Sequence, residues 1–256
     1  MIDFKDKIVF VTGASSGIGE ACARIFAGSG ARLLLCARRK DRLEKLTEDL
    51  KRRFGTDSHA FTLDVRNRNE VNTSVDRLPK EWQSVDVLIN NAGLARGLSK
   101  LHEGNIDDWE EMIDTNVKGL LYVSRRIIPG MVKRGKGDII NIGSIAGHEV
   151  YPNGNVYCAT KHAVDALTKG LRIDLVNTSL RVCTVDPGLV ETEFSIVRFH
   201  GNNQKANDVY KGLKPLTAAD IAETVFYCAS RPEHVQIAEV ILMPTSQRSS
   251  TVVGRE

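Results

Sequence analysis

The sequence lacks the features by which several classes of protein are recognised. Its five cysteines stand apart, with no C-x-x-C pair and no histidine cluster beside them, so neither a disulfide framework nor a metal site is predicted. No apolar run approaches the ~18 residues of a membrane span, and the N-terminal residues pass directly into a strand pattern without the apolar core of a signal peptide. We therefore expect a cytoplasmic protein with free thiols, no metal and no membrane partner.

A strong excess of charge of one sign is also lacking. The chain has 35 Lys and Arg against 32 Asp and Glu, and the net charge of +3 is too small and too scattered to indicate nucleic acid or an anionic membrane as the main partner. Hydrophobic residues make up 42% and charged residues 26% of the 256 positions, as in an ordinary globular protein. A chain of this length buries enough surface to fold without cross-links, so we predict a single domain over residues 1–256.

Short apolar runs alternate with longer amphipathic stretches. The runs predicted as strands are residues 8–11, 32–37, 60–63, 85–89, 138–142, 180–185 and 240–243. The stretches predicted as helices are residues 18–30, 40–54, 67–79, 105–134, 155–177 and 217–230. Strands that are apolar almost throughout and are followed by helices predict right-handed crossovers. The fold class is therefore α/β: a doubly wound, Rossmann-type parallel sheet of about seven strands with helices on both faces.

One segment, residues 189–216, interrupts this alternation because it shows no clean helical stripe. A loop of this length inside a compact domain is typical of a lid or a binding loop. We therefore expect the segment to close over a substrate.

A glycine-rich turn, T-G-A-S-S-G-I-G (12–19), joins the first predicted strand to the first predicted helix. Gly13, Gly17 and Gly19 permit a tight turn, a close approach of backbone to a pyrophosphate, and contact between helix and strand. The helix N-terminus adds unpaired N–H groups and a positive dipole end. We expect a dinucleotide to bind here. The other residues of the turn that we assign to this cofactor are Ser15, Ser16 and Ile18.

The second predicted strand ends at Ala37, where a nicotinamide cofactor without an extra phosphate usually meets a carboxylate. Arg38 and Arg39 follow instead. A guanidinium matches a 2′-phosphate, whereas Asp or Glu would repel it. The alternative is that the two arginines only begin a solvated helix, as most charge runs do. Because no acid competes at the strand end, we predict NADP(H) as the cofactor.

The third and fourth predicted strands also end in motifs. Ligands of open parallel sheets lie beyond the carboxyl ends of the strands. We expect Asp64 and Val65 to contact the adenine, and Asn91, Ala92 and Gly93 to let the cofactor lie against backbone. The alternative for the asparagines is that Asn90 and Asn91 only cap or bridge strands.

Tyr157 and Lys161 stand one helical turn apart in Y-C-A-T-K (157–161). Positions i and i+4 share a helix face, and a nearby ammonium favours the phenolate, so we expect Lys161 to lower the pKa of Tyr157 from its usual value of about 10. Ser144, at the end of the fifth predicted strand, can donate a hydrogen bond to a substrate oxygen where charge develops. A tyrosine and a lysine at this spacing also occur by chance on one helix. The serine thirteen residues earlier makes the catalytic interpretation the better one.

In combination, these motifs are specific, and over essentially the whole chain they resemble the short-chain dehydrogenase/reductase family. The matching pieces are T-G-A-S-S-G-I-G (12–19), L-D-V (63–65), N-N-A-G (90–93), Asn116 in D-T-N-V-K-G, I-G-S (142–144), Y-C-A-T-K (157–161) and D-P-G-L-V-E-T (186–192). The resemblance implies an NADP-dependent enzyme that acts on CH–OH groups. It also implies a homotetramer, with residues 105–134 and 155–177 at one interface.

The resemblance further implies roles for single residues. The active-site set would be Asn116, Ser144, Tyr157 and Lys161, with Tyr157 as general acid or base, Lys161 on the nicotinamide ribose and Ser144 on the substrate. Asn116 would hold a helix bend and a water that connects Lys161 to solvent; without the resemblance it would be a helix-interior Asn with a local hydrogen bond. The residues implied to hold the nicotinamide carboxamide are Pro187, Gly188, Val190 and Thr192.

A narrower likeness is to the NADP-dependent 3-hydroxy acid dehydrogenases, which oxidise serine and related small hydroxy acids. The segments that show this likeness include W-E-E-M-I-D-T-N, G-N-V-Y-C-A-T-K, P-G-L-V-E-T-E-F-S-I-V-R-F and I-L-M-P-T-S-Q. It implies a substrate carboxylate, which needs a guanidinium or several N–H donors. Arg198 and Arg96 are the candidates, and either could instead be a solvated or interface arginine. The residues expected at the mouth of the pocket, without a chemical role, are His148, Glu149, Asn153 and Asn155.

Two other functions remain open. One is reduction of 3-oxoacyl groups on an acidic carrier protein, or of carbonyls in general, with Lys133, Arg134 and Arg172 as a docking patch. Helix surfaces carry such residues routinely, which weakens this alternative. The other is a catalytically silent NADPH-binding sensor. The intact set of Ser144, Tyr157 and Lys161 disfavours the sensor.

Overall fold

One parallel sheet of seven strands, in the order β3-β2-β1-β4-β5-β6-β7, organises the computed structural model, which describes residues 4–256. All neighbouring strands are parallel. The strands are β1 (Ile8–Thr12), β2 (Arg32–Ala37), β3 (Ser58–Thr62), β4 (Val85–Asn90), β5 (Gly137–Ile142), β6 (Leu180–Pro187) and β7 (Glu239–Leu242). The chain runs outward from β1 to β3, then returns to β4 beside β1 and runs outward in the other direction. The predicted doubly wound α/β fold is thereby confirmed.

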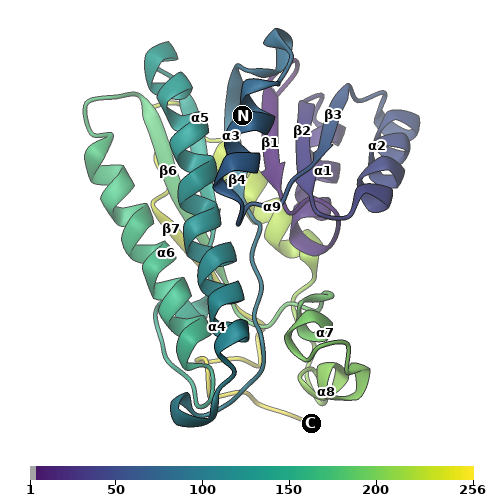
Figure 1. Cartoon of the computed structure of the whole chain (residues 1–256), viewed down its shortest axis with the longest axis vertical. Coiled ribbons are helices and arrows are strands. Elements are labelled where there is room, and N and C mark those ends of the chain that lie inside the picture. Colours follow the sequence, from purple (N-terminus) through teal and green to yellow (C-terminus); the bar gives the residue numbers. More distant parts are fainter. Residues whose placement is uncertain (1–3) are drawn as a thin grey trace.

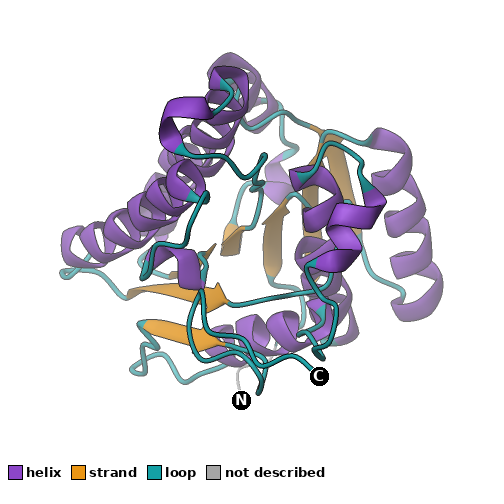
Figure 2. Cartoon of the chain, turned by 90° about the horizontal axis from the view of Figure 1, so that it is seen from below, coloured by secondary structure: helices purple, strands orange, loops and turns teal. Residues whose placement is uncertain are grey.

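Helices cover both faces of this sheet (Figures 1 and 2). On one face lie α1 (Gly17–Gly28), α2 (Lys40–Phe54) and α9 (Ala218–Ala229). On the other lie α3 (Arg68–Asp76), α5 (Leu120–Arg134) and α6 (Asn155–Asp174). Three short helices lie toward the carboxyl ends of the strands: α4 (Ile106–Ile113), α7 (Phe194–Arg198) and α8 (Asn203–Asp208).

The central strands are buried on both faces because both faces carry helices. All residues of β1 are buried, and successive side chains point to opposite sides. Val9 packs in the cluster with α1 and α9, whereas its neighbour Phe10 packs in the cluster with α5. An apolar run without alternation is therefore the correct sequence pattern for such a strand.

The long helix predicted over residues 105–134 is not regular. It consists of α4, a π-helical stretch over Asp114–Gly119, and α5. A π-helical turn holds an extra residue, displaces the side chains that follow it, and is frequent at functional sites. Hydrophobic periodicity alone could not reveal it.

The expected lid, residues 189–216, contains two short helices, α7 and α8, and lies beyond the carboxyl ends of the strands (Figure 1). Its base is closed by main-chain hydrogen bonds from Glu191 N to Leu216 O (2.9 Å) and from Leu216 N to Leu189 O (3.0 Å). Helices of five and six residues are too short to give a periodic stripe in the sequence, which is why neither was predicted.

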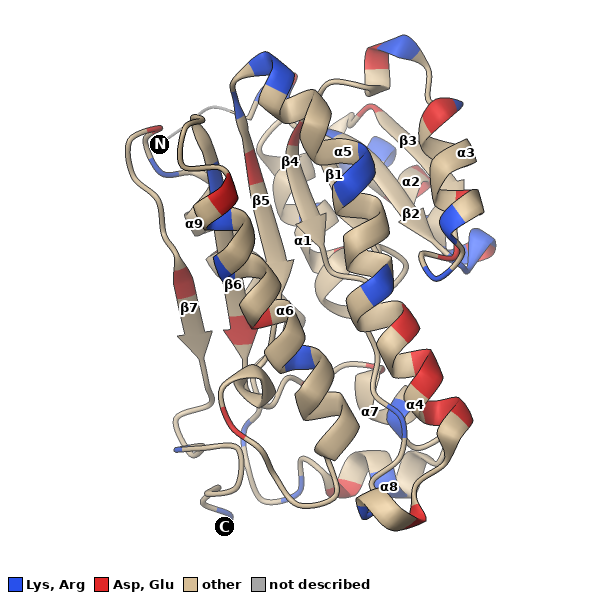
Figure 3. Ribbon diagram, turned by 60° about the vertical axis from the view of Figure 1, so that its left-hand side comes forward, with Lys and Arg blue, Asp and Glu red and all other residues tan. Residues whose placement is uncertain are grey.

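Charged residues of both signs lie along the helices in the view of Figure 3, with acidic residues on α4 and basic residues on α5. Within residues 4–256, no helix combines the length and the apolar character that crossing a membrane would require. All five cysteines are free and buried.

Candidate active site

A cleft of about 430 Å³ runs along the carboxyl edge of the sheet. The predicted residues that line it are Gly13, Ser15, Ser16, Gly17, Ile18, Arg38, Arg39, Asp64, Val65, Asn91, Ala92, Gly93, Ser144, Tyr157, Lys161, Pro187, Gly188, Val190, Thr192 and Arg198. Three other residues predicted for the site, Gly19, Asn116 and Arg96, are not among its lining, and neither are the four residues expected at the mouth of the pocket, His148, Glu149, Asn153 and Asn155. Open parallel sheets bind ligands at this edge, where the strand order reverses. The sequence motifs thus converge on one cleft.

The turn between β1 and α1 has the shape of a phosphate cradle. Gly13 has a φ of +66° and Gly17 a φ of +55°, in the left-handed region that favours glycine. A Cβ on Gly19 would lie 2.5 Å from the carbonyl oxygen of Gly13, so Gly19 supports the turn from behind and must lack a side chain. Within the described chain, Ser16 at the N-cap of α1 makes no side-chain capping bond. The first N–H groups and the positive end of the helix dipole can therefore bind a pyrophosphate.

Asn91 attaches the end of β4 to this turn. Its Nδ2 donates to the carbonyl oxygens of Thr12 (2.9 Å) and Gly13 (3.2 Å), while its backbone N–H donates to the Thr12 hydroxyl (3.0 Å). The side chain thus stabilises the cradle, in addition to the backbone contact that the sequence predicted for this position.

Arg38 and Arg39 stand at the far end of the cleft, beside the cradle. Arg39 donates to the hydroxyls of Ser16 (2.6 Å) and Ser15 (3.1 Å) and pairs with Glu193 of the lid segment (2.9 Å). Arg38 is half exposed and lies 3.5 Å from Glu111. Sequence reasoning missed Glu193, which also pairs with Arg42 at 2.7 Å, because its partners lie about 150 positions away. Two guanidinium groups beside a phosphate cradle suit a dinucleotide that carries a further phosphate.

Ser144, Tyr157 and Lys161 meet at the middle of the cleft, and all three side chains are buried. Ser144 follows β5, and its hydroxyl oxygen accepts a hydrogen bond from Ala146 N (3.1 Å). Tyr157 and Lys161 lie on one face of α6, with the Lys161 Nζ 6.0 Å from the centre of the Tyr157 ring. Lys161 donates to the carbonyl oxygen of Ile142 (2.8 Å). The i, i+4 prediction that the two side chains share a region is confirmed.

The expected electrostatic effect of Lys161 on Tyr157 is wrong. Burial raises the pKa of Tyr157, and so does Tyr151; the groups that oppose this rise are the Arg198 guanidinium and the Ser144 hydroxyl. Burial also lowers the pKa of Lys161 to about 8, against the attraction of the Asp186 carboxylate. The pKa of Tyr157 is not lowered, because the Lys161 ammonium lies 6.0 Å from the ring centre. Burial, in contrast, acts directly on each group by disfavouring its charged form.

Asn116 lies in the π-helical stretch and binds the backbone that leaves β4. Its Oδ1 accepts from Leu94 N (2.8 Å), and its Nδ2 donates to Leu94 O (2.8 Å) and to the Thr160 hydroxyl (3.0 Å). A Cβ on Gly93 would lie 3.3 Å from this Oδ1. Asn116 therefore connects the loop after β4 to α6, behind the wall of the cleft.

Arg198, at the end of α7, covers the ring of Tyr157. Its guanidinium carbon lies 4.9 Å from the Tyr157 ring centre and 5.2 Å from that of Phe194, within the range of a cation–π contact. Its Nη2 donates to the hydroxyl of Tyr151 (2.7 Å). Tyr151, which the sequence analysis did not single out, lines the same part of the cleft. The segment 189–216 therefore brings one cation into the cleft, over the ring of Tyr157.

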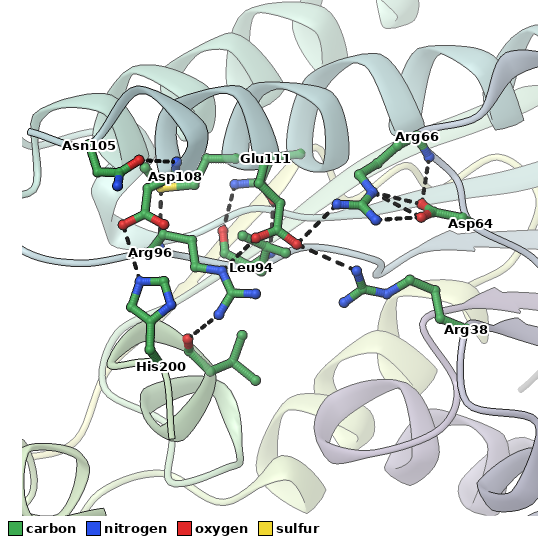
Figure 4. A network of polar contacts seen from close by, with 12 residues as sticks. Arg38, Asp64, Arg66, Leu94, Arg96, Asn105, Asp108, Glu111 and His200 are labelled. Atoms are coloured by element: carbon green, nitrogen blue, oxygen red, sulfur yellow. Dashed lines mark hydrogen bonds and ion pairs between the residues drawn. The ribbon is translucent and has the colours of Figure 1, made fainter. Parts of the chain in front are cut away.

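Arg96 does not line the cleft, contrary to its role as a substrate candidate. It belongs to a network of polar contacts with Glu111 (Figure 4). Its Nε donates to Glu111 (2.6 Å) and its Nη1 to the carbonyl oxygen of Val197 in α7 (2.6 Å). The same Glu111 accepts from Arg66 at 3.0 Å and lies 3.5 Å from Arg38. With its charge paired in this way, Arg96 attaches the lid to the body of the protein.

The basic residues proposed as a carrier-protein patch are partly used within the fold. Arg134 donates to the carbonyl oxygen of Val85 (2.5 Å), and Arg172 to those of Val182 (3.2 Å) and Ala238 (2.6 Å). These hydrogen bonds join α5 and α6 to strand ends, and the structure thus gives two of the three residues a structural role.

A group that the sequence analysis did not connect lies next to Ser144. Ligand atoms of His148, Asp186 and Glu239 lie within 4.8 Å of one another. His148 was expected at the pocket mouth, but its Nε2 lies 3.2 Å from Asp186 at the end of β6. These residues come from three separate elements, so no local motif indicates them.

Comparison with known proteins gives consistent results. Residues 7–203 match the family model described as short chain dehydrogenase. An NADP-dependent 3-hydroxy acid dehydrogenase of Schizosaccharomyces pombe is 44% identical over 251 residues, which cover 98% of this chain and 97% of the relative. A protein of Salmonella typhi with the same description is 47% identical over 241 residues (94% and 96%). A solved structure, the closed form of serine dehydrogenase complexed with NADP+, superposes with a TM-score of 0.91 at 44% identity, covering 97% of this chain and 100% of that one.

Proposed function

The chain belongs to the short chain dehydrogenase family, and from that premise we propose that it transfers a hydride between NADP(H) and the 3-hydroxyl carbon of a small hydroxy acid such as serine or 3-hydroxypropionate. The observation that carries the substrate class is the position of Arg198, with its guanidinium 4.9 Å from the ring centre of Tyr157. A cation at this distance from the acid–base group suits a substrate whose carboxylate is close to its reacting carbon.

The cleft fits the proposed cofactor. The glycine turn and the start of α1 would hold the pyrophosphate, and Arg38 and Arg39 would bind the 2′-phosphate. Asp64 and Val65 would contact the adenine, and the segment from Pro187 to Thr192 would hold the nicotinamide carboxamide. When bound, NADP(H) supplies or accepts the hydride. The protein supplies the orientation and the charges.

Tyr157 would provide the proton. Because burial raises the pKa of its phenol, the hydroxyl is protonated at neutral pH and can donate to a carbonyl oxygen as that oxygen gains charge. Ser144 would donate a second hydrogen bond to the same oxygen. Lys161, held by the carbonyl oxygen of Ile142, would bind the ribose. In the oxidative direction the deprotonated form of Tyr157, the phenolate, accepts the proton of the substrate hydroxyl.

The substrate carboxylate would bind to Arg198 and Tyr151. The Tyr151 hydroxyl already accepts from Arg198 at 2.7 Å, so the two side chains are held together and can both contact one anion. Arg96 would not contact the substrate; it would act indirectly, by keeping α7 in place. The lid over residues 189–216 would close around the substrate.

Three further predictions belong to this proposal. We propose a homotetramer with residues 105–134 and 155–177 at one interface, to be measured by size-exclusion chromatography with light scattering. We propose a cytoplasmic location, in keeping with the five free thiols. We also propose a mechanism that uses no nucleic acid, membrane or metal ion.

A substrate panel tests the proposal. Serine, allo-threonine, 3-hydroxypropionate, 3-hydroxyisobutyrate, an acyl thioester and a bulky ketone would be compared by NADPH absorbance. We expect the small hydroxy acids to have the highest kcat/KM, and Arg198→Met to lower kcat/KM for them by about tenfold or more, because a charge-assisted hydrogen bond contributes about 1.5–3 kcal/mol. A neutral ketone should lose little in the same variant. Preference for the thioester would indicate the carrier-protein function, and NADPH binding without any turnover would indicate the sensor.

A further inference from the structure

Asp186 lies directly beneath the catalytic serine. It lies at the carboxyl end of β6 and is 1% exposed. Its Oδ1 accepts from the backbone N–H of Ser144 (3.1 Å) and from the Thr184 hydroxyl (2.8 Å). The carboxylate therefore contacts the main chain of the residue that is expected to bind the substrate oxygen.

Gly143 makes this contact possible. A Cβ at position 143 would lie 1.7 Å from the Asp186 Oδ1, a separation that no side chain can adopt. The I-G-S motif thus requires glycine at its centre because a buried carboxylate packs against its backbone. The motif therefore places Ser144 in the cleft and, through Gly143, leaves room for the Asp186 carboxylate.

The second oxygen of Asp186, Oδ2, is the inner end of a row of charged groups that extends to the surface of α6. It accepts no hydrogen bond of good geometry within residues 4–256, and the atom closest to pairing with it is the Nε2 of His148, at 3.2 Å. On the other side of the imidazole, Nδ1 lies 3.9 Å from Glu239, and Glu239 lies 3.7 Å from Lys169 on α6. Lys169 also pairs with Asp165 at 2.8 Å. Charged groups therefore line up from the surface of α6 to the carboxylate beneath Ser144.

A metal site would be a competing interpretation of the same three residues. However, the two carboxylates face different nitrogens of the His148 ring, Asp186 at Nε2 and Glu239 at Nδ1. One bound ion would use one of these nitrogens and draw both carboxylates to it. The observed arrangement suits an imidazole that bridges two carboxylates.

We propose that Asp186 is a positioning residue of the active site, which holds the main chain at Ser144 and places a negative charge beside the segment 142–144, where Lys161 binds the carbonyl oxygen of Ile142. We propose further that His148 keeps this carboxylate in place. The inference rests on the proposed function, because it takes Ser144 and Lys161 as the groups that act on substrate and cofactor.

The electrostatics of the site agree with this geometry. Burial lowers the pKa of Lys161 to about 8, and Asp186 is the carboxylate that opposes the decrease. Burial also raises the pKa of Asp186, while the Thr184 hydroxyl and His148 oppose that rise. Other charged groups also face this part of the protein. Glu239 raises the pKa of Asp186, Lys169 and Asp165 lie beyond Glu239, and the pKa of Glu149 is lowered chiefly by hydrogen bonds from Ser250. Loss of the Asp186 charge should therefore let Lys161 lose its proton at a lower pH.

Two substitutions separate the two roles of Asp186. Asp186→Asn keeps an oxygen for the Ser144 N–H but removes the charge, so the alkaline decrease in kcat/KM should begin about one pH unit lower than in the wild type, since a nearby opposite charge shifts a pKa by about 1–3 units. Asp186→Ala removes the acceptor as well, so kcat should also decrease at neutral pH. His148→Gln removes the side chain that holds the Asp186 carboxylate and should shift the alkaline limb in the same direction. Glu223→Gln, which removes an exposed carboxylate of α9 that does not line the cleft, should match the wild type.

Two measurements do not depend on turnover. NADPH affinity, followed by nicotinamide fluorescence from pH 6.5 to 9.5, should weaken at a lower pH in Asp186→Asn than in the wild type. Hydrogen–deuterium exchange of peptides that cover residues 142–147 should be faster in Asp186→Ala, with exchange in β1 unchanged, which also shows that the variant is folded. Unchanged pH profiles and unchanged exchange in both variants would overturn the inference.

Tyr157→Phe, measured in parallel, separates this inference from the proposed function. If Tyr157→Phe keeps full turnover, the proposed function fails. If Tyr157→Phe is inactive while Asp186→Asn behaves as the wild type, only the role of Asp186 fails. A last experiment measures the Tm of the wild type with and without added Zn²⁺. If Zn²⁺ increases the Tm and Glu239→Gln abolishes this increase, the three residues form an ion site, and the bridging role of His148 is overturned.

Discussion

Arg96 donates a hydrogen bond of 2.6 Å to the carbonyl oxygen of Val197, and so attaches α7 to the loop that follows β4. A second bond at the same place, from Gly97 N to Arg198 O (2.8 Å), strengthens the attachment. Because Arg198 lies over the Tyr157 ring, the position of its guanidinium depends on these two main-chain contacts. Glu111 holds Arg96 in turn, at 2.6 Å.

Replacing Arg96 by Met should therefore weaken substrate binding without removing a substrate contact. We expect KM for the hydroxy acid to increase by about tenfold, the effect of losing one charge-assisted hydrogen bond of about 1.5 kcal/mol. The dissociation constant of NADPH should change by less than about twofold. Steady-state kinetics and fluorescence titration measure the two quantities. Lys100→Gln, which removes an exposed cation near the same loop, is the control. If Arg96→Met instead kept the wild-type KM, α7 would not depend on this anchor.

Tyr157→Phe should abolish turnover and preserve NADPH binding. The phenyl ring can still pack on Phe194, whose ring centre lies 5.6 Å away, but the exchangeable proton is lost. General acid–base catalysis typically contributes about 10²–10⁴-fold, so kcat should decrease by at least about 10². NADPH fluorescence provides the binding measurement. A variant with undiminished kcat would assign the proton transfer to another group.

Arg38 and Arg39 should determine the choice of cofactor. Changing both to neutral residues should weaken NADPH far more than NADH, because their charges act on the extra phosphate. We expect a difference of about tenfold or more in the ratio of the two kcat/KM values. The structure adds Glu193, which pairs with Arg39 at 2.9 Å. Glu193→Gln should therefore strengthen NADPH binding or leave it unchanged. Equal losses for NADPH and NADH in the double variant would contradict the assignment.

The sequence was sufficient for the parts of the site that depend on local geometry. Gly13 and Gly17 could be assigned because a turn with positive φ needs glycine, and Tyr157 and Lys161 because four residues make about one helical turn. The topological rule for open sheets then placed both motifs at one edge. Neither step needs information about distant contacts.

Other features depend on partners far away in the chain. Arg96 was a candidate for the substrate because its contact with Val197, 101 positions away, has no local signal. Asp186 and His148 come from β6 and from the turn after β5, and only the sheet brings them together. The pKa of Tyr157 was predicted in the wrong direction because spacing indicates the presence of Lys161 and says nothing of burial.

Lys161 should lower the free energy of unfolding of the protein. Burial lowers its pKa from 10.5 to about 8, so at neutral pH a charged ammonium is held in a site that disfavours charge. Lys161→Met removes this penalty, although it leaves the carbonyl oxygen of Ile142 without its donor. We expect the free energy of unfolding to increase by about 1–2 kcal/mol at pH 7, with activity lost.

The pH dependence distinguishes this cause from better packing by Met. Below pH 8 the ammonium is charged in both folded and unfolded states, so the full penalty applies to the wild type. Between pH 8 and 10.5 the folded protein releases its proton before the unfolded chain does, and the stability of the wild type increases relative to the variant. The difference in unfolding free energy, measured by urea denaturation at several pH values, should therefore shrink as the pH increases from 8 to 10. A difference that stays constant over this range would show that the charge of Lys161 is not its cause.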